Sequence, residues 1–146
     1  MPLQLIPEIH RATHRIGIYL ENIPDLGITQ GEAHILSHLA AFGDSTIAEL
    51  HRALAHRRST LTSILDRLVA RGFITRDTGA KDRRTFVVRL TKQGKKVAAD
   101  VYRKLAQLEA LALARVSKEN LRSLNSVLRT LGAPAESPPS RKRSSR

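Results

Sequence analysis

The sequence predicts a mainly helical α+β protein, in which a series of amphipathic helices is interrupted by one small β-hairpin. Three observations indicate this class. Apolar residues recur at spacings of three and four along several segments, a pattern typical of helices with one buried face. The run Phe86–Leu90 instead alternates with the period of two that a half-buried strand requires. Glycine, proline and helix-capping residues separate these segments.

Length and composition exclude several classes of protein. At 146 residues the chain is long enough to bury a core without disulfides or a structural metal. It has no cysteine, which excludes a disulfide framework, a thiolate zinc site and a cysteine nucleophile. The first ten residues do not resemble a signal peptide, and no apolar run approaches the ~20 residues of a membrane span. We therefore expect a cytoplasmic protein without membrane association.

The net charge of +12 indicates a polyanionic partner, although a well-solvated basic surface would account for it too. Most of this charge is local. Residues 52–96 contain 13 Lys and Arg against three acids, which is a net charge of +10 out of the total. A polyanion would therefore bind chiefly to this part of the chain.

The N-terminal segment, residues 1–28, is predicted to form one amphipathic helix from about Pro7 to Asn22. Proline is tolerated in the first turn of a helix, because its missing amide would have no partner there. A proline, an aspartate and a glycine within residues 24–27 then end the helix. Its apolar face would have to pack against something outside a small core, so we expect a dimerisation helix.

Two capping boxes begin the next two helices. Thr29 and Glu32 have the spacing at which each side chain can bond to the other residue's amide, and Thr46 and Glu49 repeat it. The first of these helices should end near a glycine and the second should be short. Only residues 55–57 then separate it from another helical pattern, which is the turn length of a helix-turn-helix.

The helix that follows, residues 57–71, has a one-sided apolar stripe and ends at Gly72, which can adopt the left-handed conformation cheaply. The stripe consists of Leu61, Ile64, Leu65 and Leu68. Two β-rich runs, 73–76 and 86–90, flank a charged hairpin tip at 77–85. A helix-turn-helix followed by such a hairpin is a winged helix-turn-helix, and we assign it to the segment between the terminal helices, residues 29–91.

The C-terminal part is predicted to contain a long helix, about 92–116, and a last helix, 118–131. Their apolar stripes exceed what one small core can cover, so we expect residues 92–132 to join the N-terminal helix in a homodimer interface. Residues 133–146 are rich in proline and serine and end in basic residues, which favours a disordered basic tail.

A helix-turn-helix with a basic hairpin is suited to double-stranded DNA. The major groove admits an α-helix, and short polar or basic side chains near the helix N-terminus reach base edges and phosphates. Basic residues of a hairpin tip can follow the backbone or enter the minor groove. The alternative for each arginine is a solvated surface charge. The candidate contacts are Arg57, Arg58, Ser59, Thr60, Ser63 and Arg67 on the helix, and Lys81, Arg83 and Arg84 on the hairpin.

The segment resembles the MarR family of bacterial winged-helix transcription regulators. The resemblance depends on Asp66-x-Leu68-x-x-x-Gly72-x-Ile74-x-Arg76 and on Asp82-Arg83-Arg84 followed by Leu90-Thr91-x-x-Gly94. It implies a two-fold dimer on a pseudo-palindromic operator, with Arg84 entering the minor groove and Asp82 orienting the wing arginines. It also implies that Ser59, Thr60 and Ser63 face bases. Many relatives have an arginine where this chain has Ser63, so the base preference of this chain at that contact should differ from theirs.

The resemblance further implies a small phenolic or lipophilic effector, bound between the dimerisation helices and the winged helix-turn-helix. Candidate pocket residues are His14, Tyr19, His34 and His38. The pairs His10/His14 and His34/His38 have the spacing that can place two imidazoles on one metal, or sense protons, but solvated histidines give the same pattern. No acid is placed to complete a zinc site, and we expect neither a metal nor another cofactor.

No enzyme motif is found: there is no phosphate-binding glycine loop, HExxH, GxSxG or nucleophile–base pair.

An ion pair between Asp66 and Arg76 could link the helix at residues 57–71 to the hairpin that forms the wing. We expect a dimeric sequence-specific regulator, most simply a repressor released by a ligand. The alternatives are a sequence-nonspecific architectural DNA-binding protein and a winged-helix module that binds other proteins.

Overall fold

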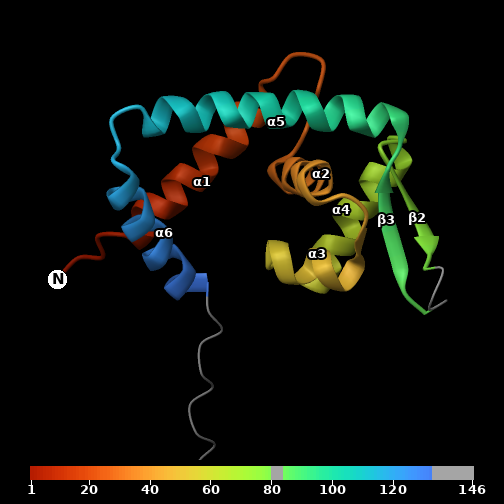
Figure 1. The fold of residues 1–146 in the computed structure, drawn as a ribbon, viewed down its shortest axis with the longest axis horizontal. Helices are drawn as coiled ribbons and strands as arrows, with labels where there is room; N and C mark the ends of the chain where they lie inside the picture. Colours follow the sequence, from red (N-terminus) through yellow and green to blue (C-terminus); the bar gives the residue numbers. More distant parts are fainter. Residues whose placement is uncertain (80–83, 133–146) are drawn as a thin grey trace, which may run out of the picture. The chain divides into compact units, whose positions relative to one another are not determined.

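The computed structural model describes residues 1–79 and 84–132. The predicted mainly helical α+β class is confirmed (Figure 1). Lys81, Asp82 and Arg83 of the wing tip and the predicted tail, 133–146, lie outside the described residues. The elements in chain order are α1 (Ile6–Glu21), α2 (Gln30–Phe42), β1 (Ser45–Thr46), α3 (Ile47–Leu54), α4 (Arg58–Ala70), β2 (Ile74–Thr78), β3 (Phe86–Leu90), α5 (Lys92–Leu113) and α6 (Lys118–Gly132).

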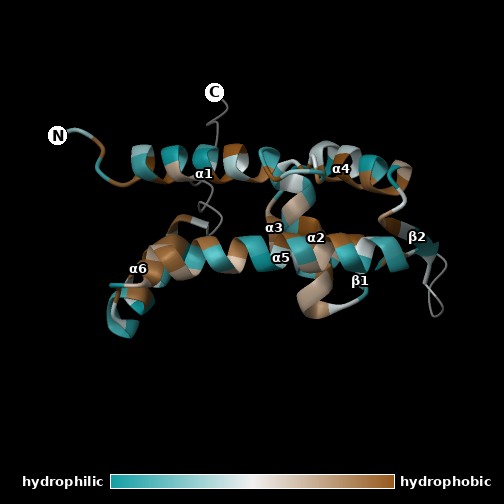
Figure 2. Cartoon of the chain, turned by 90° about the horizontal axis from the view of Figure 1, so that it is seen from above, coloured by the Kyte–Doolittle hydropathy of each residue, from teal (hydrophilic) through white to brown (hydrophobic). Residues whose placement is uncertain are grey.

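The chain forms two compact units, Met1–Gln107 and the part from Leu108 onward. The first unit holds the whole hydrophobic core of the described residues. The core is built by apolar residues of α1, α2, α3, α4, the sheet and the first half of α5, with Leu20, Ile35, Leu36, Leu50, Leu61, Leu65, Leu68, Val88 and Val101 almost fully buried. Around α1, hydrophilic and hydrophobic residues occupy different sides, as an amphipathic helix requires (Figure 2).

Both predicted capping boxes are present. The Thr29 hydroxyl accepts from the Glu32 amide at 3.3 Å, and the Glu32 carboxylate accepts from the Thr29 amide at 3.5 Å. In the second box, the corresponding distances between Thr46 and Glu49 are 3.1 and 2.7 Å. The hydrogen bond from the Thr46 amide is the main reason why the pKa of the Glu49 carboxyl lies below its usual value. These boxes fix where α2 and α3 begin.

The sheet contains one more strand than predicted. Its order is β1-β3-β2, with both pairings antiparallel. The short strand β1 pairs Ser45 with Val88, so it ties the start of α3 to the wing. The strand β2 runs to Thr78, so the first two residues of the predicted tip belong to the ladder. A hydrogen bond from the Gly79 amide to the Thr85 carbonyl, 2.6 Å long, closes the hairpin beyond it.

The junction between α4, the wing and α5 depends on two glycines. Gly72 has φ +74°, the left-handed conformation predicted for it. The Thr91 hydroxyl donates to the Gly72 carbonyl at 2.6 Å and accepts from the Gly94 amide at 2.9 Å. A Cβ atom on Gly94 would lie 1.8 Å from the Phe73 carbonyl oxygen, so only glycine fits there. The recognition helix, wing base and start of α5 are thereby held in one arrangement.

The C-terminal helices match the prediction with small changes at their ends. Helix α5 ends at Leu113, about three residues before the predicted limit. Helix α6 is capped by Ser117, whose hydroxyl accepts from the Asn120 amide at 3.1 Å. Within residues 1–79 and 84–132, none of the helices combines the length and apolar character needed to cross a bilayer.

Candidate nucleic-acid interface

The N-terminal end of α4 presents polar groups that have no partner among the described residues. Arg57 is the N-cap and has an extended backbone, but its side chain makes no capping hydrogen bond. Arg57, Arg58, Ser59 and Thr60 are exposed, and their side chains make no hydrogen bond or ion pair within the described part of the chain. The first amides of the helix also lack a capping side chain, and such amides favour phosphate.

The other half of α4 is tied to α2 by a buried acid. Glu32 is 3% exposed, and its carboxylate accepts from Arg67 Nε at 3.0 Å and from Arg71 Nη1 at 3.2 Å. Arg67 Nη1 also donates to the Ser63 hydroxyl at 3.1 Å. Arg71 reaches the loop before α2, donating to the carbonyls of Gly27 and Leu26 at 2.9 and 2.7 Å. The sequence had indicated only the capping role of Glu32.

Four exposed polar side chains of α4 share one surface hollow. It has a volume of about 430 Å³ and brings together the candidates Ser59, Thr60, Ser63 and Arg67. The remaining lining residues are Thr29, Gly31, His56 and Ile64. A cluster of hydroxyls beside a guanidinium is suited to hydrogen bonding with base edges.

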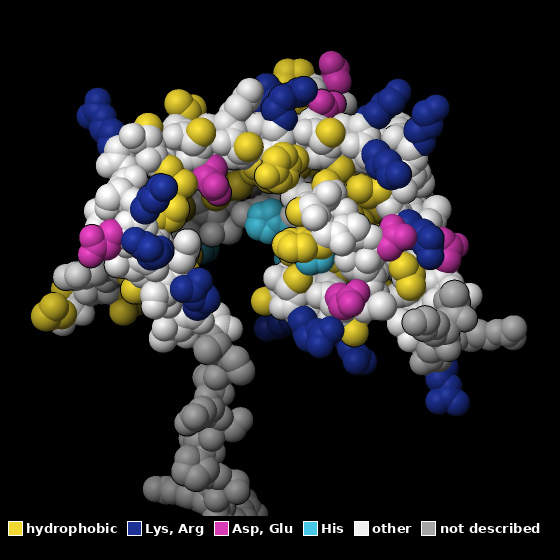
Figure 3. All heavy atoms as spheres, in the orientation of Figure 1, with side chains coloured by type: hydrophobic (Ala, Val, Ile, Leu, Met, Phe, Trp, Pro, Cys, Tyr) yellow, Lys and Arg dark blue, Asp and Glu magenta, His cyan; other side chains and the backbone are white. Residues whose placement is uncertain are grey.

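The wing lies beside this helix and is joined to it by an ion pair. Arg76 on β2 donates to the Asp66 carboxylate on α4 at 2.6 Å, which is the contact considered from the sequence. Arg84, where the description of the chain resumes after the tip, is exposed. Lys and Arg side chains gather below α3 and α4 (Figure 3).

The four predicted effector residues lie on α1 and α2 and make separate contacts. The Tyr19 hydroxyl donates to the Lys104 carbonyl at 3.4 Å. The His14 ring meets the His10 ring edge-on at 4.8 Å, and the His38 ring lies 4.8 Å from that of Phe42. Partial burial, with His56 nearby, lowers the pKa of His34. In the described part of the chain, no hydrogen bond, ion pair or ring contact joins any two of the four, so their role as one pocket stays a prediction.

Metal binding by the histidine pairs finds little support in the geometry. Among the residues that the structure describes, no group of three or more His, Asp or Glu side chains is placed to hold a metal ion. A pair of imidazoles without a third ligand gives an incomplete site for zinc.

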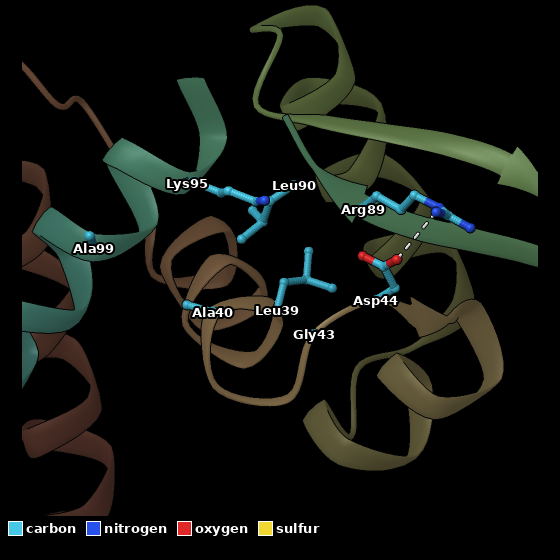
Figure 4. Close-up of a pocket in the computed structure, with 8 residues that line it drawn as sticks. All are labelled: Leu39, Ala40, Gly43, Asp44, Arg89, Leu90, Lys95 and Ala99. Atoms are coloured by element: carbon cyan, nitrogen blue, oxygen red, sulfur yellow. Dashed lines mark ion pairs between the residues drawn. The ribbon is translucent and has the colours of Figure 1, made fainter. Parts of the chain in front are cut away.

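A pocket that sequence reasoning missed lies between α2, β3 and α5 (Figure 4). Its volume is about 610 Å³, and it is lined by Leu39, Ala40, Gly43, Asp44, Arg89, Leu90, Lys95 and Ala99. Asp44 and Arg89 form an ion pair at 3.4 Å. The Lys95 ammonium has no ion pair with any described residue. No local pattern could have indicated this pocket, because its walls come from three segments far apart in the chain.

The helix-turn-helix of α3 and α4, with a three-stranded wing joined to it, defines a winged helix-turn-helix protein. Residues 26–85 match the family model described as the MarR family. This segment of the chain is therefore similar to the MarR family of winged helix-turn-helix transcriptional regulators.

Individual relatives show the same similarity. The chain is 30% identical over 79 residues to the uncharacterized HTH-type transcriptional regulator YfiV of Bacillus subtilis. The matched region is 54% of this chain and 49%, about half, of that relative's length. A mutant MarR from E. coli complexed with operator DNA is 25% identical, with TM-score 0.71 over 89% of this chain and 91% of that one. BpsR of Bordetella bronchiseptica, 18% identical with TM-score 0.71 over 92% of this chain and all of that one, shares the fold.

Proposed function

We propose that this chain is a sequence-specific transcription regulator that places α4 in the major groove of DNA and its wing in the adjacent minor groove. The observation that carries the proposal is the exposed N-terminal end of α4, where Arg57, Arg58, Ser59 and Thr60 have no partner within the described residues. Polar side chains left without partners at a helix end cost little in water and are available to bases and phosphates. The operator complex of the E. coli relative supports the same use of the fold. A cytoplasmic location belongs to this proposal.

The active species is proposed to be a homodimer on a pseudo-palindromic operator. Support comes from exposed apolar residues on the terminal helices, taken one helix at a time. On α1, Ile6 and Ile18 are exposed, and on α6 no residue is buried although one side of the helix is apolar. Leu124, Val127, Leu128 and Leu131 are the exposed apolar residues of α6. A second copy would remove these surfaces from water. Residues 1–28 and 92–132 are accordingly assigned to dimerisation.

Competition binding distinguishes this regulator from an architectural DNA-binding protein. A regulator should prefer one site by about 10³-fold or more over bulk DNA at physiological salt. Equal affinity for the site and for bulk DNA would instead support the architectural alternative. The measurement is fluorescence anisotropy of a labelled site with unlabelled competitor at a stated salt concentration.

The wing is tested through Arg84. An arginine in the narrow minor groove gains from its negative potential. The variant Arg84→Ala should therefore weaken binding to the preferred site by roughly 1–3 kcal/mol. An unchanged affinity in this variant would remove the wing from the account. The matched control is Arg15→Ala, which removes an exposed arginine of α1.

Regulation by release of a repressor upon ligand binding is the finer part of the proposal. BpsR, by the description of its structure, has its DNA binding regulated by 6-hydroxynicotinic acid. In this chain the pocket between α2, β3 and α5 combines apolar walls with Arg89 and Lys95, which suits a small organic anion. Asp44 directly precedes β1, and Arg89 lies on β3, so an anion competing for Arg89 would act where the wing meets α3.

Benzoate is a simple probe of that pocket. Benzoate should lower DNA affinity in the wild type, and Lys95→Gln should weaken this effect several-fold. The variant Lys96→Gln, which changes an adjacent lysine of α5 outside the pocket lining, is the control. An equal response in both variants would rule out the pocket, whereas an altered response in His14, Tyr19, His34 or His38 variants would favour the site predicted from the sequence.

A further inference from the structure

We propose that Glu32 and Arg67 determine which hydrogen bond Ser63 offers to DNA, so that Ser63 donates to a base acceptor and selects against an amino group at that position. The acceptors in the major groove are thymine O4, guanine O6 and purine N7, and the amino groups are adenine N6 and cytosine N4. This inference rests on the proposed function, because it needs α4 in the major groove.

Arg67 is held in place by Glu32. Glu32 belongs to α2 and is buried, whereas Arg67 is about half exposed on α4. A buried carboxylate without a partner would be costly, so the protein retains the arginines that satisfy it. The bond from Arg67 Nε to the Glu32 carboxylate is 3.0 Å long. Because the guanidinium is planar and rigid, fixing Nε also limits where Nη1 can lie.

Arg67 in turn contacts Ser63. Arg67 Nη1 donates to the Ser63 hydroxyl oxygen at 3.1 Å, one helical turn away. A serine hydroxyl has one proton to donate and two lone pairs. One lone pair is taken by the guanidinium, whose positive charge disfavours a second donor beside it and strengthens the hydroxyl as a donor.

The hydroxyl proton of Ser63 remains available for a hydrogen bond to DNA. No acceptor for the Ser63 hydroxyl is found among the described residues, and the side chain is exposed in the hollow that it shares with Ser59 and Thr60. A hydroxyl that already accepts from a cation and has no acceptor of its own is arranged to donate outward. At the base edge, an acceptor would complete its hydrogen bonds and an amino group would oppose it.

Arg71 provides a matched comparison. It makes an ion pair with the same Glu32 carboxylate at 3.2 Å, but its other hydrogen bonds go to the carbonyls of Leu26 and Gly27. The variants Arg67→Gln and Arg71→Gln therefore each remove one arginine from Glu32, and only the first removes the contact with Ser63. A general loss of stability would affect both, whereas a change in base readout should affect one.

The experiment measures base preference at every position of the preferred site, using full-length protein and duplexes with single base-pair substitutions. The variant Ser63→Ala identifies the base pair that Ser63 reads, by relaxing preference there about two- to tenfold. We expect Arg67→Gln to relax preference at that same base pair and Arg71→Gln to leave it unchanged. Glu32→Gln, which keeps an acceptor for the Thr29 cap, should change it in the same direction as Arg67→Gln. Thermal unfolding confirms that each variant is folded.

Two results would overturn the inference while leaving the proposed function intact. One is an Arg67→Gln variant that loses affinity for all duplexes alike and whose salt slope falls by about 0.9, the signature of a lost phosphate contact. The other is a Ser63→Ala variant with unchanged preference at every position. A wild type that prefers no site at all would instead contradict the proposed function, and this inference with it.

Discussion

At the N-terminal end of α4, Arg57 and Arg58 extend without a partner in the described residues, whereas Arg67 and Arg71 further along the same helix meet at Glu32. All four contribute equally to the net charge. They differ in whether another element supplies a carboxylate. The comparison teaches that a basic helix contains two kinds of arginine, one that binds a partner and one that holds the helix in place.

The two groups should therefore respond differently to the same substitution. Removal of an arginine without an internal partner should change DNA affinity and leave the free energy of unfolding nearly unchanged. Removal of an arginine or acid from the Glu32 network should change the free energy of unfolding first.

The double variant Arg57→Ala/Arg58→Ala should show the largest effect. Two contacts of roughly 1–3 kcal/mol each should be lost together, which gives a loss of about 2–6 kcal/mol in the free energy of DNA binding if the two contributions add. The midpoint of urea unfolding should be unchanged. Fluorescence anisotropy and urea denaturation of the same sample check both statements, and a marked loss of stability would remove the distinction between the two ends of α4.

The variant Glu32→Ala should reduce the free energy of unfolding by about 1–3 kcal/mol, because it removes three hydrogen-bond acceptor contacts at once. The loss stays below that of a fully buried ion pair, since water can solvate Arg67 and Arg71, which are 48% and 35% exposed. Urea denaturation measures it. The isosteric Glu32→Gln variant should lose less, because its amide oxygen can still accept hydrogen bonds. Losses equal to those of Glu32→Ala would show that a neutral acceptor replaces none of the contribution of the carboxylate.

The ion pair between Asp66 and Arg76 should contribute less. Both side chains are partly exposed, so Asp66→Asn should cost under about 1 kcal/mol in the free energy of unfolding. If this pair also positions the wing, DNA affinity should fall by more than stability does. A variant that loses neither would mark the pair as an ordinary surface contact.

The smallest effect concerns pH. Burial and His56 lower the pKa of His34, so the unfolded chain binds a proton at this histidine more readily than the folded one. Its contribution to stability is therefore present above the unfolded pKa near 6.5 and is lost as the pH falls below it. Urea denaturation between about pH 7.5 and 5 should show a downward slope that His34→Asn reduces. An unchanged slope in that variant would contradict the assignment.

Features set by neighbouring residues could be predicted from the sequence. The capping boxes at Thr29 and Thr46 lie within four residues, and the stop at Gly72 depends on one φ angle. The alternation of residues 86–90 placed β3 correctly, and the one-sided apolar stripe of residues 57–71 placed the buried face of α4.

Features that depend on distant residues could not be predicted. The strand β1 has only two residues and shows no periodicity, and its partner lies more than 40 positions away. Glu32 had an adequate local role as a cap, so nothing in the sequence indicated that it also holds Arg67. The close approach of Gly94 to Phe73 likewise arises only when α5 packs against the loop after α4.

The most direct test of the central claim is selection of binding sites from random duplex DNA by the full-length protein. A dimer with one α4 in each of two successive major grooves should enrich an inverted repeat whose half-site centres lie about 10 base pairs apart. Arg57→Ala/Arg58→Ala should enrich it less strongly. Recovery of sequences with no common motif, or of a motif without two-fold symmetry, would contradict the account.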